Sequence, residues 1–226
     1  MNNSASQSAS GEASEQSQEV SAQGSSLKGF LLRAVLWLPL AFFFWVLWRQ
    51  LFVAPVTLLV DAFLTGVWPE QFYAIIQIGH ELEAQVLMAV PEELAKMGEG
   101  RPVLGLPVNP LIYGYGLPLF AGLVICTPLS HGVRALQILI GWLVIVLVQA
   151  WGSVWDIFQI LHFQLGQSGG AEVMTEIGVG ASTTALAYQF GYLIMPSVVP
   201  VVAWMVLNRR FIESLVPQLS GLSQRR

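Results

Sequence analysis

Four long apolar stretches divide this chain, at residues 30–48, 111–129, 135–155 and 185–207. Each is close to the ~20 residues that an α-helix needs to cross a hydrocarbon core. Only 11% of the residues are charged, against about 25% in typical soluble domains. Because so few charges could not cover the surface of a soluble protein of this length, the stretches predict four transmembrane helices in a mainly α-helical membrane protein.

The basic residues predict how these helices are oriented. Seven of the ten fall where four spans would put them on one side of the bilayer, namely Lys28, Arg33, Arg134, Arg209, Arg210, Arg225 and Arg226. Lysine and arginine collect on the cytoplasmic side of membrane proteins. We therefore expect both termini and a turn at 130–134 in the cytoplasm. Segments 49–110 and 156–184, which hold ten of the fourteen acidic residues, would lie outside.

The two ends of the chain are expected to be cytoplasmic tails, at 1–29 and 208–226. Residues 1–26 are rich in serine and contain no aromatic residue, a composition typical of disorder. A cleaved signal peptide is the alternative interpretation of the N-terminal region. It fits less well, because the region before the apolar core is long and acidic and no small-residue cleavage site follows that core.

The outer segment 49–110 is too long for a plain loop, so we expect it to fold into a small helix-plus-β-hairpin element. Leu59, Phe63 and Val67 recur at helical spacing and predict an amphipathic helix over 55–68. This helix would lie on the outer leaflet, with its apolar face also covering the next element. A short helix and a turn are expected over 91–101, followed by an extended segment over 101–110 because of its prolines.

Residues 72–88 alternate with period two, which predicts a β-hairpin. A three-residue turn at 79–81 would pair Ile78 with Leu82 and place the apolar even positions on one buried face. A two-residue turn would set Ile78 against Glu81 and mix the faces, so the pattern favours the first register.

Few residues could carry chemistry. Cys126, His131 and Arg134 are the candidates for a cysteine nucleophile with a base and a charge stabiliser. A lone cysteine in an apolar helix is more often a small buried hydrophobe, so we expect no catalytic residue here. His80, Glu81 and Glu83 fit a solvated turn better than a metal site. His162 stands alone, Gln149 could bond a neighbouring helix, and Asp156 would reach the headgroups.

No phosphate-binding loop or zinc-protease motif occurs, and no long basic patch supports nucleic-acid binding. We therefore expect no cofactor and no metal. Four small residues, Gly180, Thr184, Ala187 and Gly191, recur at helical spacing near the last apolar stretch. Such a stripe allows close helix contact in lipid, either within this chain or with a partner.

The sequence Val108-Asn109-Pro110-Leu111-Ile112-Tyr113-Gly114-Tyr115-Gly116-Leu117-Pro118-Leu119-Phe120 enters the second apolar stretch. With the outer segment before it and two later spans, it resembles the exosortase H-associated membrane proteins. The resemblance implies a bacterial inner-membrane protein that accompanies an exosortase, a membrane enzyme that processes C-terminally tagged exported proteins. It implies no catalytic residues. Exosortases have more spans and a Cys, Arg and His set that faces outward, unlike Cys126 here.

The first hypothesis is therefore a non-catalytic accessory protein of the inner membrane. It would sit in the lipid bilayer and bind an exosortase-type enzyme or its substrate. The alternative is an intramembrane cysteine peptidase or transpeptidase that uses Cys126. A small transporter subunit has less support, since only Gln149 and Asp156 could line a polar path.

Overall fold

The computed structural model describes residues 29, 32–88 and 102–213. A helix at Leu32–Leu47 is followed by α2 (Arg49–Val67), the strands β1 (Phe72–Ile78), β2 (Glu81–Leu87) and β3 (Val103–Val108), and the helices α4 (Leu111–Gly114) and α5 (Gly116–Cys126). The rest of the described chain forms α6 (His131–Gln159), the π-helical turn η1 (Ile160–Gln164), the 3-10 turn η2 (Gly166–Ser168), α7 (Gly170–Ile177), α8 (Ala181–Gln189), the π-helical turn η3 (Phe190–Ile194) and α9 (Met195–Leu207).

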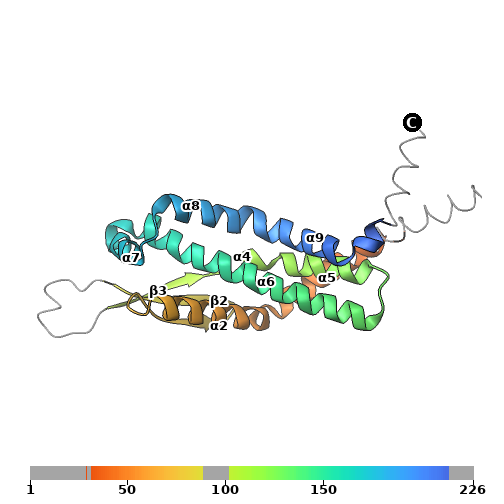
Figure 1. The fold of residues 1–226 in the computed structure, drawn as a ribbon. Coiled ribbons are helices and arrows are strands. Elements are labelled where there is room, and N and C mark those ends of the chain that lie inside the picture. The colour runs from red at the N-terminus through yellow and green to blue at the C-terminus, as the bar shows by residue number, and fades with distance from the viewer. Residues whose placement is uncertain (1–28, 30–31, 89–101, 214–226) are drawn as a thin grey trace, which may run out of the picture.

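The long helix α6 is the axis of an elongated molecule (Figure 1). Helices α5 and α9 pack along its N-terminal part, whereas α2, the sheet and α7 lie beside its C-terminal part. The Leu32–Leu47 helix contacts α5, where a Cβ on Gly122 would come within 2.6 Å of Leu38 Cδ2. The two ends of the molecule therefore differ in construction, since one is purely helical and the other combines helices with a sheet.

Three stretches of the described residues are long and apolar enough to cross a membrane: Arg49–Val67, His131–Gln164 and Ala181–Leu207. The helices Leu32–Leu47 and Leu111–Cys126 are apolar but shorter. These findings agree with a mainly α-helical membrane protein. The count of four spans stays a prediction.

The predicted boundaries also shift. Because α6 begins at His131, the expected 130–134 turn is replaced by a link over 127–130. The expected loop over 156–184 is largely helical, since α6 continues through η1 and is followed by α7 and the start of α8.

The three strands form an antiparallel sheet in the order β1-β2-β3. The predicted hairpin register is wrong: Ile78 pairs with Glu81, and Gly79 and His80 form a two-residue turn. Gly79 has φ +66°, a left-handed conformation that two-residue hairpin turns require and that glycine adopts readily.

A β-bulge explains how this register still buries apolar residues. The bulge lies between Phe72 and Ala74, so Phe72 and Ile75 both face the core, while Ile76 and Ile78 face outward. The expectation that even positions share one buried face therefore fails for most of β1. It is confirmed for β2, where Leu82, Ala84 and Val86 are each 0% exposed.

The third strand was predicted only as an extended segment over 101–110. β3 pairs with β2 along its whole length, from Val103 opposite Leu87 to Val108 opposite Leu82. The element that was expected to be a lone hairpin, which would be marginal in water, is thus a three-stranded sheet. The short helix expected at 91–101 lies outside the described residues.

The helix predicted over 55–68 forms, but it begins at Arg49 and presents a different face to the core. Val56, Val60 and Leu64 are 0% exposed and pack against the sheet and α6. Leu59 and Phe63, which the prediction placed on the packing face, are 38% and 47% exposed. Since α2 carries apolar residues around most of its circumference, their spacing alone did not identify the buried side.

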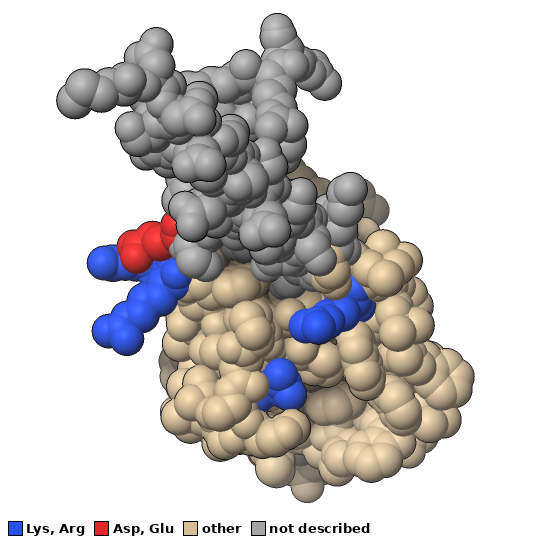
Figure 2. Space-filling view, turned by 90° about the vertical axis from the view of Figure 1, so that its right-hand side faces the viewer, with Lys and Arg blue, Asp and Glu red and all other residues tan. Residues whose placement is uncertain are grey.

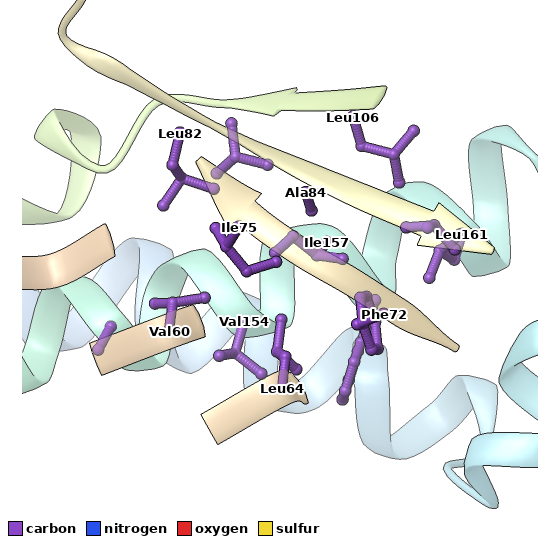
Figure 3. Close-up of a cluster of buried hydrophobic side chains, with 14 of the residues drawn as sticks. Val60, Leu64, Phe72, Ile75, Leu82, Ala84, Leu106, Val154, Ile157 and Leu161 are labelled. Atoms are coloured by element: carbon purple, nitrogen blue, oxygen red, sulfur yellow. The ribbon is translucent and has the colours of Figure 1, made fainter. Parts of the chain in front are cut away.

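The core lies between one face of the sheet, α2 and the C-terminal half of α6 (Figure 3). Val60 and Leu64 come from α2, Ile75 and Leu82 from the sheet, and Ile157 from α6. Burying side chains of this size contributes about 1.5–3 kcal/mol each. The sheet is therefore an integral part of the folded unit and is fixed to α6.

Candidate functional site

A cluster of tyrosines surrounds Asp156 where α4, α6 and α8 meet. The Tyr113 hydroxyl donates a hydrogen bond to the Asp156 carboxylate, and Tyr113 and Tyr188 are also hydrogen-bonded. The rings of Tyr188 and Tyr192 stack with centroids 5.8 Å apart, and Tyr113 meets Tyr192 edge-on at 6.3 Å. The Asp156 carboxylate is thus bonded to Tyr113 of α4, and Tyr113 in turn links it to Tyr188 of α8. No salt bridge to Asp156 is found in the part of the chain that the structure describes.

Two glycines allow α4 and α5 to lie close against α6. A Cβ on Gly152 would sit 2.2 Å from Tyr113 Cγ, and one on Gly141 would sit 2.1 Å from Phe120 Cε1. These glycines are eleven residues apart, which is about three helical turns. This pair was not predicted from the sequence, although its spacing is a detectable signal. Gln149, which was expected to bond a neighbouring helix, donates to the Pro110 carbonyl at 3.2 Å.

The small-residue stripe of the last span lies mainly against α6. Thr184 is 0% exposed, and the Ala187 carbonyl accepts a hydrogen bond from Trp151 Nε1 at 3.3 Å. A Cβ on Gly191 would meet Trp151 Cδ1 at 3.0 Å, whereas one on Gly180 would meet nothing within 4 Å. The geometry therefore favours packing within this chain, and a role for the stripe in binding a partner stays a prediction.

Cys126, His131 and Arg134 lie near one another in sequence, around the α5–α6 link. The Cys126 side chain is buried, with 1% exposure, while His131 is exposed in the first turn of α6. Arg134 Nη2 donates to the carbonyls of Thr127 and Leu129, at 3.4 and 3.2 Å. The guanidinium thus binds carbonyls just beyond the end of α5.

Two other polar contacts tie segments together. Gln137 and Asn208, both buried, exchange amide hydrogen bonds of 3.2 and 3.0 Å between α6 and the end of α9. The His162 ring donates from Nε2 to the Val179 carbonyl at 2.8 Å. The Gln137–Asn208 pair was not predicted from the sequence.

His80, Glu81 and Glu83 are at or beside the hairpin turn. Within the described residues, no group of three or more His, Cys, Asp or Glu side chains is placed to hold a metal ion.

Two apolar grooves open on the sides of the helical bundle. One lies between α2, α6 and α9, and the other lies between the Leu32–Leu47 helix, α5 and α6. Tryptophans line both: Trp68, Trp151 and Trp155 the first, and Trp45, Trp48 and Trp142 the second. Such surfaces suit contact with lipid chains or apolar helices and offer no polar group for chemistry.

Charges are divided between the two ends of the molecule. Four of the five described bases, Arg33, Arg134, Arg209 and Arg210, belong to the purely helical end, and Figure 2 shows basic side chains gathered there. Arg209 pairs there with Glu213 at 3.0 Å. Seven of the eight described acids belong to the end that carries the sheet: Asp61, Glu70, Glu81, Glu83, Asp156, Glu172 and Glu176.

One comparison with known proteins identifies a family. Residues 24–211 match the family model described as exosortase H-associated membrane protein. No curated protein and no solved structure matches the chain. The match covers the apolar helices, the sheet between them and the Asp156 cluster. The chain therefore belongs to the family of exosortase H-associated membrane proteins.

Proposed function

We propose that this protein is a non-catalytic accessory protein of the bacterial inner membrane, which supports an exosortase-type protein-sorting system by binding the enzyme or its substrate. The observation that carries this proposal is the family match over residues 24–211. An accessory role needs surfaces that bind, and the chain has apolar grooves at membrane-helix level and an acidic end with a sheet.

The arrangement around Cys126 supports a role without catalysis. A cysteine nucleophile needs a base within hydrogen-bond reach and room for its substrate. Here the thiol is buried, and Arg134 is occupied by two backbone carbonyls. The cysteine peptidase alternative is therefore not favoured by any observed geometry.

We also propose that the basic end is cytoplasmic, because basic residues favour that side of the bilayer. Single cysteines at Gly132 and Gln167, in a Cys126→Ala background, test this orientation with a membrane-impermeant maleimide. Residue 167 should react in intact spheroplasts, and residue 132 should react only after lysis. Reaction of both in intact spheroplasts would contradict the four-span topology.

The partner is tested by purifying the tagged protein in mild detergent from its native membranes and identifying the bound proteins by mass spectrometry. We expect an exosortase-type enzyme to be recovered. The Cys126→Ala variant is the matched control, because it should recover the same enzyme and sustain processing. A clean monomer from cells shown to express the enzyme would count against the accessory role.

A further inference from the structure

The two edges of the sheet differ in whether another element covers them. On β1, the Ile75 N–H donates to Asp61 Oδ1 on α2 at 2.7 Å, so the helix covers this edge. On β3, no strand pairs with the outer edge within the described residues. An unpaired edge presents backbone N–H and C=O groups that another extended chain can bind.

The pairing pattern identifies which groups point outward. Met88 N–H donates to the Pro102 carbonyl at 3.0 Å, which fixes the alternation along β3. Leu104, Leu106 and Val108 therefore direct their backbone groups to β2, whereas Val103 and Gly105 direct theirs outward. Val103 is 51% exposed, and Gly105 is also exposed. Because Pro107 has no N–H, the outward backbone donors within β3 are those of Val103 and Gly105.

Glu83 lies beside this open edge. Its side chain extends from β2 across the outer face of β3, so that a Cβ on Gly105 would come within 2.7 Å of Glu83 Cδ. Because Gly105 has no side chain, the Glu83 carboxylate can lie over it. No salt bridge to Glu83 occurs in the described part of the chain. A basic side chain opposite Gly105 on an added strand would lie next to this carboxylate.

We propose that the open edge of β3 binds an extended peptide segment by strand addition, with a lysine or arginine of that segment placed against Glu83. Strand addition takes affinity from backbone hydrogen bonds and specificity from side chains that alternate along the strand. The acidic character of this end of the molecule favours a basic segment. That the segment belongs to the exosortase-type enzyme or its substrate rests on the proposed function.

The test uses the full chain in nanodiscs of phosphatidylcholine, whose headgroup carries no net charge. The probe is a short fluorescent peptide in which valine and lysine alternate, and binding is followed by anisotropy. We expect saturable binding. It should weaken about tenfold when N-methylation of the peptide backbone removes the N–H groups that donate hydrogen bonds to the edge of β3. Replacing lysine with glutamate in the peptide should abolish binding.

Two matched variants locate the site. Glu83→Gln should weaken binding of the lysine peptide about tenfold, whereas Glu81→Gln, on the same sheet face but away from β3, should leave it unchanged. Gly105→Pro removes a backbone donor at the edge, and it should abolish binding. Since Gly105→Pro also risks the fold, Glu83→Gln remains the decisive variant.

Equal binding by the Glu83→Gln and Glu81→Gln variants, or undiminished binding of the N-methylated peptide, would overturn this assignment. A lack of peptide binding, while the exosortase-type enzyme still co-purifies, would overturn the edge site and leave the proposed function standing. Peptide binding with the expected Glu83 dependence, without any enzyme recovered, would support the edge site and contradict the accessory role.

Discussion

The neighbouring residues Ile75 and Ile76 should differ sharply in what they contribute to stability. The bulge in β1 places Ile75 in the core at 5% exposure and Ile76 on the outer face at 38%. Truncating each to alanine removes the same three carbons from one strand. Because the substitution and the strand are the same, a difference in the free energy of unfolding between the two variants reflects burial, which the bulge determines.

The magnitudes follow from burial. Three carbons at about 0.8 kcal/mol each give a transfer loss of about 2.4 kcal/mol for full burial. Ile75→Ala should lose nearly all of this and leave a cavity against Leu82 and Ile157, for a total of about 3–4 kcal/mol. Ile76→Ala should lose only about 1.5 kcal/mol, since part of its side chain is already in solvent and no closed cavity forms.

The free energy of unfolding of the two variants can be compared with that of the wild type by denaturant titration in mild detergent. Tryptophan fluorescence is a suitable signal, because Trp68 packs on the core through Phe158, with ring centroids 5.6 Å apart. Equal losses for the two variants, or a greater loss for Ile76→Ala, would refute the bulge and restore the even-position face.

Three further outcomes are expected. Gly152→Ala should destabilise the protein by about 1–3 kcal/mol, because its Cβ would overlap the Tyr113 ring. Gln137→Leu should cost about 0.6 to 1.7 kcal/mol in detergent unfolding, because the Asn208 amide loses its partner. Cys126→Ala should leave exosortase-dependent processing at the wild-type rate, since the buried thiol only packs.

Each of these outcomes has a control or a result that would contradict it. Gly66→Ala, on α2 where a Cβ would meet nothing within 4 Å, should be neutral or stabilising, so a loss like that of Gly152→Ala would argue against the Tyr113 contact. The Gln137→Leu/Asn208→Leu double variant should be less destabilised than the sum of the single variants. A fall in processing for Cys126→Ala at unchanged membrane level would point to the cysteine enzyme.

The sequence predicted those features that depend on local composition. The apolar helices and the alternation of β2 follow from residue type and period, which each segment carries alone. The register of β1 could not be predicted from the alternation of apolar residues. It depends on a two-residue turn that begins at Gly79 and on a bulge at Tyr73, which shifts the alternation along β1 by one residue. A period-two pattern of apolar residues does not show where a β-bulge interrupts the strand.

The packing faces and the polar cluster depended on long-range contacts. α2 is apolar on several sides, so only its neighbours decide that Val60 is buried and Phe63 is exposed. Asp156 was identified as an ionisable group near a span end. Its partner Tyr113 lies more than forty positions earlier in the chain, and no spacing rule connects them. The prediction of an exosortase-associated family rested on one short motif and the layout, and it is confirmed.

The length of α6 has a consequence for how a partner could be reached. With η1 it forms a continuous helical rod of 34 residues, about 51 Å at ~1.5 Å per residue. A hydrocarbon core of ~30 Å accommodates only part of that rod, so about 20 Å would stand clear of the bilayer in the proposed orientation. Because the sheet packs on the C-terminal part of α6, the helix would in that orientation act as a spacer that sets the height of β3 above the membrane. A membrane-anchored partner would have to present its extended segment at that same height, and shortening α6 by whole turns would lower the sheet without altering its edge.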